Sequence, residues 1–164
     1  MRAAAHVWPD VYSYTSVIDA CAKAGQPGRA FEVLEEMRRE RVSPNLVTFN
    51  ALILACGSGG EWRRALSFVD EIETCGFSPD DVTLTLTVAA CDAGGEWDRV
   101  VERLAETSMG RDAFWARLAI AACGRVGDWR AGMGVVGEMR ALGVKRSVDV
   151  YNALIESLAV RITR

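Results

Sequence analysis

The sequence predicts an all-α fold, a solenoid of stacked antiparallel helix pairs, on two observations. One segment recurs four times, and Cys21, Cys56, Cys91 and Cys123 mark the same place in each copy, at spacings of 35, 35 and 32 residues. A period of that length is typical of a stacked array in which each unit packs on its neighbours. Within each copy, apolar residues recur at helical spacing, and glycines separate two such stretches.

The clearest unit runs over residues 46–80. Asn45 is a good N-cap and Pro44 disfavours helix before it, so the first helix begins just after them. The glycine-rich stretch 57–60 is predicted to end that helix, because glycine readily adopts the left-handed cap conformation. A second helix is predicted over Trp62–Thr74, where apolar residues again recur at helical spacing, and Gly76 ends it.

The other copies give the predicted organisation of the chain. Residues 1–10 form the end of a preceding repeat, 11–45 repeat 1, 46–80 repeat 2, 81–112 a short repeat 3, 113–147 repeat 4, and 148–164 a partial repeat or terminal helix. That terminal helix is expected to expose Leu154, Ile155 and Leu158, because it has no partner helix. Terminal repeats need polar capping faces. The chain is therefore expected to be a fragment of a longer array, or a short array capped by another protein.

Composition limits the possible functions. Half of the 164 residues are apolar and a quarter are charged, which is typical of a globular chain. The net charge is −3, unlike the lysine- and arginine-rich composition of a strong general nucleic-acid binder. Repeats 2 and 3 carry −3 and −4, whereas repeat 4 carries +4. No apolar run reaches the roughly 18 residues of a membrane span.

The cysteines and tryptophans are interpreted mainly as packing residues. The four repeated cysteines are predicted to be buried, and Cys75 to be exposed near a helix end. Their spacing contains no close pair of the zinc-binding kind, and their odd number fits a reducing compartment, so neither a metal nor a cofactor is expected. Trp62, Trp97 and Trp129 share one position, either as an aromatic ladder or, as we favour, as packing against the next repeat. Trp8 and Trp115 lie outside that pattern and are interface candidates.

The repeated unit resembles the pentatricopeptide repeat. Residues 11–45 (VYSYTSVIDACAKAGQPGRAFEVLEEMRRERVSPN) and 46–80 (LVTFNALILACGSGGEWRRALSFVDEIETCGFSPD) follow its pattern V-T-Y-N-x-L-I, then A-C, G, A, F or L, M, G and P-D or P-N. The tetratricopeptide repeat fits less well, because it requires a small residue where Ile18, Ile53 and Ile155 lie. The resemblance extends from Val11 to Arg164 and implies a right-handed superhelical solenoid.

Members of this family are mostly single-stranded RNA binders of mitochondria and plastids, in which one repeat reads one base. The resemblance implies that the fifth and last residues of each unit contact the base edge. These pairs are Thr15 with Asn45, Asn50 with Asp80, Thr85 with Asp112, and Arg117 with Ser147. The first three pairs imply adenine, uracil and guanine in 5′ to 3′ order, and the fourth departs from the usual pairs. Asn45, Asp80 and Asp112 are also expected as helix N-caps.

The resemblance also implies contacts to base faces and phosphates. The second residue of each unit would sandwich the bases, and these residues are Tyr12, Val47, Val82 and Phe114. The fifth unit has Asp149 at that place, which cannot stack. Lys23 and Arg125 are the candidate phosphate contacts, at a position that repeats 2 and 3 fill with Ser58 and Ala93.

Two functional hypotheses follow. One is a single-stranded RNA-binding module that acts in organellar RNA processing, stability or translation. The alternative is a protein–protein scaffold in an organellar ribosome, respiratory complex or photosystem, docking through the terminal helix 148–164. An enzyme is not expected, because His6 is the sole histidine and the segment GSGGEW follows a helix, unlike a phosphate-binding loop. A chloroplast or mitochondrial location is implied by the family resemblance alone.

Overall fold

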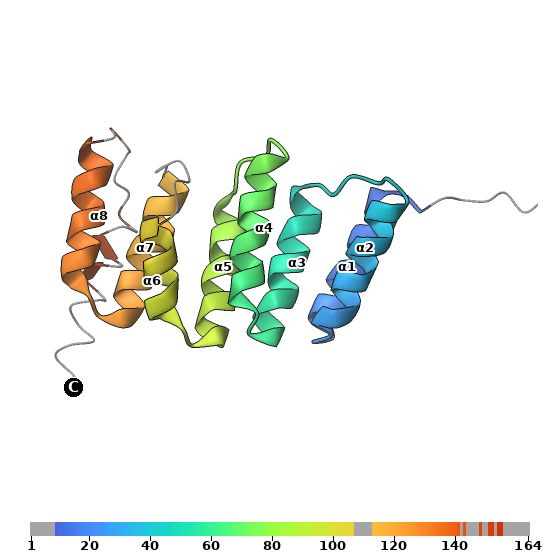
Figure 1. Cartoon of the computed structure of the whole chain (residues 1–164), viewed down its shortest axis with the longest axis horizontal. Coiled ribbons are helices and arrows are strands. Elements are labelled where there is room, and N and C mark those ends of the chain that lie inside the picture. The colour runs from blue at the N-terminus through green and yellow to red at the C-terminus, as the bar shows by residue number, and fades with distance from the viewer. Residues whose placement is uncertain are drawn as a thin grey trace, which may run out of the picture.

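The computed structural model describes residues 9–106 and 113–141, together with Gly143, Val148, Tyr151, Asn152, Leu154 and Ile155. Within these residues it contains eight α-helices and no strand, so the all-α solenoid predicted from the sequence is confirmed. Figure 1 shows the helices side by side in one row, with α1 and α2 at one end and α8 at the other. The helices are α1 (Val11–Lys23), α2 (Pro27–Arg39), α3 (Leu46–Gly59), α4 (Trp62–Thr74), α5 (Asp81–Gly94), α6 (Trp97–Glu106), α7 (Ala113–Val126) and α8 (Trp129–Ala141).

Side-chain caps determine where the first helices of the first three predicted repeats begin. Asp10, Asn45 and Asp80 are the N-caps of α1, α3 and α5, and each side chain accepts a hydrogen bond from a backbone N–H three residues later. At α3 and α5 the residue at that place is a threonine whose hydroxyl accepts from the cap N–H in return, which completes a capping box. The predicted N-cap roles of Asn45 and Asp80 are therefore confirmed, whereas Asp112 lies outside the described residues.

The end of α3 lies within the predicted glycine-rich stretch 57–60. The helix continues to Gly59, and its left-handed cap is Gly60, at φ 65°. Gly57 stays helical and lies against the neighbouring helix, where an added Cβ would meet the Cα of Ala90 at 3.7 Å. The predicted helix end within 57–60 is therefore confirmed, and the structure identifies Gly60 as the capping glycine.

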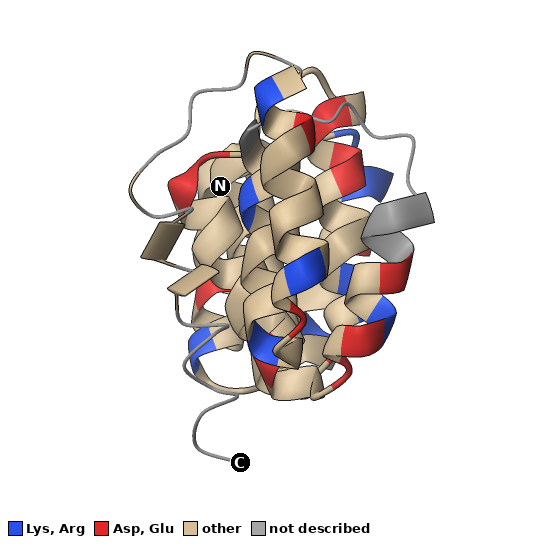
Figure 2. Ribbon diagram, turned by 90° about the vertical axis from the view of Figure 1, so that its left-hand side faces the viewer, with Lys and Arg blue, Asp and Glu red and all other residues tan. Residues whose placement is uncertain are grey.

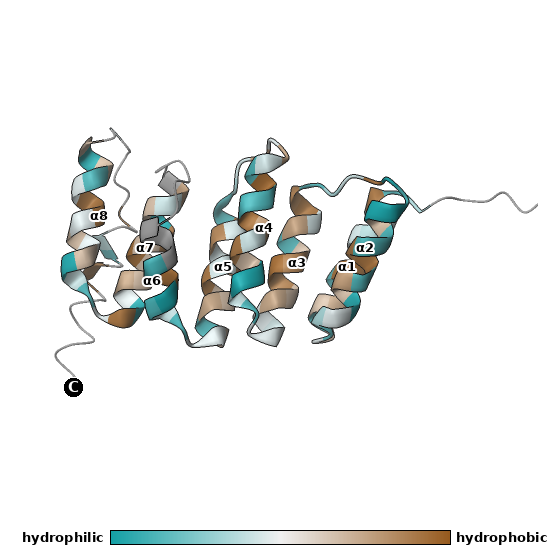
Figure 3. Cartoon of the chain, viewed as in Figure 1, coloured by the Kyte–Doolittle hydropathy of each residue, from teal (hydrophilic) through white to brown (hydrophobic). Residues whose placement is uncertain are grey.

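The helices form two layers that share one apolar core. The first helices α1, α3 and α5 lie next to one another, while α2, α4 and α6 each pack against the first helix of the following pair. Figure 3 shows that α3, in the middle of the row, is coloured largely as hydrophobic. Its side chains Phe49, Leu52 and Ile53 are fully buried, because α1 and α5 flank this helix and α2 and α4 pack against it from the other layer. The core thereby fixes the relative placement of α1, α3 and α5.

The repeated tryptophans are largely covered, and Trp62 packs against the following repeat, as the favoured interpretation predicted. Trp62 is 7% exposed and Trp97 is 9% exposed, and Trp129 is half-buried. A Cβ added to Gly94 of α5 would lie 2.4 Å from Cδ1 of Trp62, so this glycine makes room for the indole. Trp115, expected to be free for an interface, is instead 7% exposed and part of the core, because an indole ring gains from burial. Trp8 lies outside the described residues.

Among the described residues of the terminal segment, one apolar side chain is buried. Leu154 was expected to be exposed, but its side chain is 7% exposed and lies against Gly132 of α8. Burial of a leucine side chain contributes roughly 1.5–3 kcal/mol, which accounts for this contact. Ile155 is 62% exposed, as expected, and Leu158 lies outside the described residues. In the described part of the chain, no helix is long and apolar enough to cross a membrane.

The cysteines are free thiols in three environments. Cys56, Cys91 and Cys123 are buried, Cys21 is half-buried and Cys75 is exposed. Burial raises the pKa of the Cys56 and Cys91 thiols to about 12 and that of Cys123 to about 11. Among the described residues, no group of three or more histidine, cysteine or acidic side chains could hold a metal ion.

We expect Cys75 to be the fast-reacting thiol of the folded protein. Only the thiolate attacks a disulfide reagent, and burial together with a raised pKa keeps Cys56, Cys91 and Cys123 protonated and covered. Titration with Ellman's reagent should therefore show one fast equivalent, removed by Cys75→Ser, a slower one from the half-buried Cys21, and three equivalents that appear only in denaturant. Equal rates for all the cysteines would contradict this packing.

Candidate functional site

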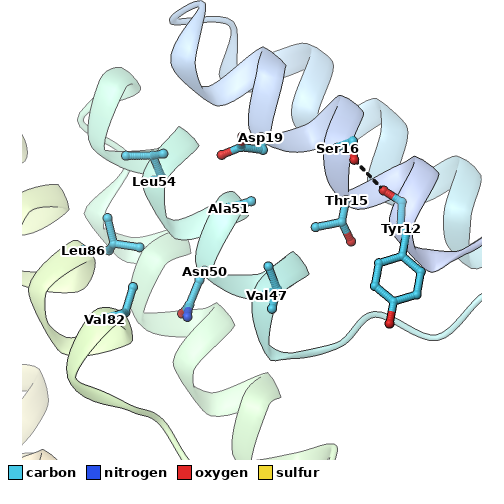
Figure 4. A pocket seen from close by; sticks show the side chains of 10 residues that line it. All are labelled: Tyr12, Thr15, Ser16, Asp19, Val47, Asn50, Ala51, Leu54, Val82 and Leu86. Carbon is cyan, nitrogen blue, oxygen red and sulfur yellow. Dashed lines mark hydrogen bonds between the residues drawn. The ribbon is translucent and has the colours of Figure 1, made fainter.

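The first helices of repeats 1, 2 and 3, which are α1, α3 and α5, line a groove of about 570 Å³. Figure 4 shows its lining side chains, which come from α1, α3 and α5. They are Tyr12, Thr15, Ser16, Asp19, Val47, Asn50, Ala51, Leu54, Val82 and Leu86. Five of these, Tyr12, Thr15, Val47, Asn50 and Val82, are residues that the family resemblance singled out. The structure therefore brings the candidate residues of consecutive units together on one surface.

Three of the predicted base-sandwiching side chains project into solvent beside this groove. Tyr12 is 74% exposed, Val47 is 63% exposed and Val82 is 55% exposed. They occupy the same place in three successive first helices, so they stand in a row along the stack. Exposed apolar side chains at this regular interval are suited to contact the flat faces of a planar ligand.

Sequence reasoning missed the other five residues that line the groove. Ser16, Asp19, Ala51, Leu54 and Leu86 each follow one of the predicted five by four positions. Residues four apart lie one above the other on the same helix face. The four-residue spacing could therefore have identified these residues from the sequence. It would have predicted that Leu54 and Leu86 form the apolar floor of the groove.

Asn50 and Asp80 form the best-defined polar pair of the site. The Asn50 amide Nδ2 lies 3.5 Å from Oδ1 of Asp80, and the Asn50 amide oxygen accepts from the Thr83 hydroxyl at 2.7 Å. The Thr83 backbone N–H, which donates to Asp80 at 2.8 Å, is the main cause that lowers the pKa of Asp80, with further contributions from the Thr83 hydroxyl and the Asn50 amide. Asp80 is therefore an ionised, acceptor-only group at neutral pH.

Thr15 and Asn45 meet through a buried threonine in the same way. The Thr15 hydroxyl lies 2.7 Å from the hydroxyl of Thr48, and Thr48 donates to Oδ1 of Asn45 at 3.0 Å. Asn45 also accepts from the Thr48 backbone N–H at 2.9 Å. The first two candidate pairs therefore share one geometry, although their residue types differ.

Comparison with protein families tests the resemblance directly. A model of the pentatricopeptide repeat domain matches residues 3–59 and 119–160, and a model of the single repeat matches residues 47–77. Together, the two segments of the domain match make up more than half of the chain. The chain belongs to the pentatricopeptide repeat family. A search by sequence among curated proteins finds no significant match.

Solved structures with the same fold include other pentatricopeptide repeat proteins. The chain is 30% identical to PPR10 in complex with an 18-nucleotide psaJ RNA element, with a TM-score of 0.61 over 94% of the chain. A second structure, of PPR10 from maize, is 21% identical with a TM-score of 0.59 over 97% of the chain and 22% of PPR10. Nuclear proteinaceous RNase P 2 from A. thaliana is 16% identical, with a TM-score of 0.55 over 92% of the chain and 35% of that enzyme. The chain spans 23% of the RNA-bound PPR10 chain.

The pentatricopeptide repeat pattern is altered where α5 meets α7. Phe114, expected to sandwich a base, is 6% exposed and belongs to the apolar core, unlike Val47 and Val82 at the same place of repeats 2 and 3. Arg117 forms an ion pair with Asp81 at the start of α5. The Thr85 hydroxyl donates to the backbone carbonyl of Asp81 at 2.8 Å. Phe114 is therefore unavailable for base contact as it stands, and the partners Asp112 and Ser147 lie outside the described residues.

The two candidate phosphate contacts carry ion pairs in the structure. Lys23 Nζ lies 2.6 Å from Oδ2 of Asp19 on the same helix, and Arg125 Nη2 lies 2.9 Å from Oδ2 of Asp92 on α5. Both cations are largely exposed, so each pair contributes little to stability. Figure 2, viewed from the α8 end, shows acidic and basic residues interspersed over the described helices. A phosphate would have to compete with a carboxylate at each of these positions.

Proposed function

We propose that this chain is a single-stranded RNA-binding module that holds bases along the groove of α1, α3 and α5. One observation carries this proposal: Tyr12, Val47 and Val82 alternate along that groove with the hydrogen-bonding residues Thr15 and Asn50. Apolar side chains would hold the base faces, and amide, hydroxyl and carboxylate groups would contact the base edges. The similarity to RNA-bound PPR10 supports the same function.

Base identity would follow from the two complete pairs. Asp80 is an acceptor and the Asn50 amide offers a donor, which together suit uracil, with its N3–H and its carbonyl oxygens. Thr15 and Asn45 would read the preceding base, which the family pattern gives as adenine, and Thr85 with Asp112 the following one, given as guanine. We further propose a role in organellar RNA processing, stability or translation, in chloroplasts or mitochondria, as a binder and not as a catalyst.

The expected affinity is low. Stacking contributes roughly 1–3 kcal/mol per base, and the described groove offers two complete polar pairs. Phosphate neutralisation usually supplies much of the affinity for nucleic acids, and here Lys23 and Arg125 already face carboxylates. We therefore expect micromolar dissociation constants with a shallow dependence on salt.

A short RNA with the trinucleotide AUG should bind more tightly than the same RNA with GUA. The two oligonucleotides have the same composition and charge, so a difference in fluorescence anisotropy titrations reports base order alone. Val47→Asp should abolish binding, because a carboxylate in place of the exposed valine repels the phosphates and cannot hold a base face.

Ser67→Asp is the matched control for that variant. It adds the same charge at an exposed position of α4, in the other layer of helices, and should leave RNA binding unchanged. A wild-type chain that shows no salt-dependent binding to any single-stranded RNA at micromolar concentration would contradict the proposed function.

The second candidate function is a protein scaffold that docks through the terminal residues. Val148, Tyr151 and Ile155 are 73%, 44% and 62% exposed, and they lie within the segment 148–164 that was proposed as a docking element. A scaffold of this kind should self-associate in isolation, which size-exclusion chromatography with light scattering measures. A monomer that binds RNA would favour the first function.

A further inference from the structure

Two buried threonines contact the candidate base-reading residues from the next repeat. Thr48 and Thr83 are both 0% exposed, and each is the third residue of its unit. The Thr83 hydroxyl lies 2.7 Å from the Asn50 amide oxygen and 2.8 Å from Oδ1 of Asp80. The Thr48 hydroxyl lies 2.7 Å from the Thr15 hydroxyl and 3.0 Å from Oδ1 of Asn45. Each threonine therefore links both members of one base-reading pair.

The Thr83 hydroxyl selects one of the two orientations of the Asn50 amide. As observed, the amide oxygen accepts from Thr83 and the Nδ2 group faces the Asp80 carboxylate at 3.5 Å. Rotating the amide by 180° would place its oxygen next to the Asp80 carboxylate. Two acceptors would then face each other without a proton between them, which is unfavourable. The Thr83 hydroxyl also accepts from the Asp80 backbone N–H at 3.3 Å, so its single proton points away from that N–H and is shared between the Asn50 amide oxygen and Oδ1 of Asp80. The remaining amide N–H is left for a ligand.

The fourth repeat supplies an internal contrast. Its third residue is Trp115, so α7 offers no hydroxyl at the place of Thr48 and Thr83. Thr85, the fifth residue of repeat 3, takes the place of Thr15 and Asn50. Its hydroxyl donates instead to the backbone carbonyl of Asp81 in its own helix, at 2.8 Å. The orientation of the fifth residue thus follows the identity of the third residue of the next unit.

We propose that Thr48 and Thr83 are positioning residues that determine base specificity, by holding Thr15 with Asn45 and Asn50 with Asp80 in one hydrogen-bonding arrangement. This inference rests on the proposed RNA binding and extends it to two residues that no base can reach. In Thr83→Val the Asn50 amide oxygen would face a methyl group. It would then recover a hydrogen bond from water by turning out of the groove, because an unpaired polar group is costly to bury.

The test compares Thr83→Val, Thr83→Ser and Thr48→Val in titrations with AUG RNA and with RNAs changed at the first or second base. Thr83→Val should reduce the preference for uracil at the second base by about three- to tenfold, the worth of one hydrogen bond. It should leave the preference at the first base unchanged. Thr48→Val should do the reverse, and Thr83→Ser, which keeps the hydroxyl, should behave as wild type.

A purely structural role predicts a different result, since a loosened helix would weaken binding to every RNA equally. Uniform weakening, or an unchanged uracil preference in Thr83→Val, would overturn this inference while leaving RNA binding intact. Failure of the wild-type chain to bind any RNA would overturn the proposed function and this inference with it. If Thr83→Val loses its helical circular dichroism, Thr48→Val decides by its effect on the first base.

Discussion

Replacing Phe49 with alanine should lower the free energy of unfolding by about 3–5 kcal/mol. Phe49 is 0% exposed, and its ring centroid lies 6.4 Å from that of Phe68 on α4. Phe68 in turn lies 6.1 Å from the ring of Phe31 on α2, so the three rings connect three helices. A domain is typically stable by only about 5–15 kcal/mol. The loss should therefore appear as a large shift of the urea midpoint followed by circular dichroism at 222 nm.

Val47→Ala is the control for Phe49→Ala. Val47 lies two residues earlier on the same helix, but its side chain is 63% exposed, so its truncation should change stability by at most about 0.5 kcal/mol. The same change should weaken RNA binding, because it removes an apolar group beside the groove. A small loss for Phe49→Ala would mean that α3 is not the buried centre of the solenoid.

The fold could largely be predicted because its helix boundaries are encoded locally. The N-caps Asn45 and Asp80 are capping residues in the sequence as well as in the structure, and the predicted helix Trp62–Thr74 has the observed bounds of α4. The end of α3 was predicted within 57–60, but not which glycine caps it, since Gly57 and Gly60 differ only in their surroundings. Gly57 lies against α5, and only the later glycine adopts the left-handed conformation.

The candidate site could be predicted only where the repeats are regular. The residues of repeats 1 and 2 share a groove because each unit of 35 residues returns the same helix face to the same side of the stack. The short repeat 3 changes how α7 meets α5, which buries Phe114 and pairs Arg117 with Asp81. Neither contact follows from counting positions. The hydroxyl contacts of Thr48 and Thr83 cross between repeats and likewise become visible only when the helices are placed.

Replacing Asp80 with asparagine should switch the base preference at the second position from uracil to cytosine. Uracil presents a donor at N3 and cytosine an acceptor, and an ionised Asp80 accepts only, whereas an asparagine amide also donates. The ratio of the two dissociation constants should change by roughly 5- to 100-fold, the discrimination of one good base-edge contact. Because the pKa of Asp80 is lowered by its hydrogen bonds with Thr83 and Asn50, the uracil preference of the wild type should stay constant from pH 7 to about pH 5.

The preceding repeat provides the reason why this variant should fold. Asn45 occupies the same place and forms the same capping box with Thr48 that Asp80 forms with Thr83. Asparagine and aspartate are nearly equivalent as N-caps, so Asp80→Asn should change stability by about 0.5 kcal/mol or less, whereas Asp80→Ala should cost about 1 kcal/mol. An Asp80→Asn variant with an unchanged ratio of uracil to cytosine affinity would show that Asp80 caps α5 and reads no base. A changed ratio at unchanged stability would separate the two roles, because the cap is kept and only the base contact differs.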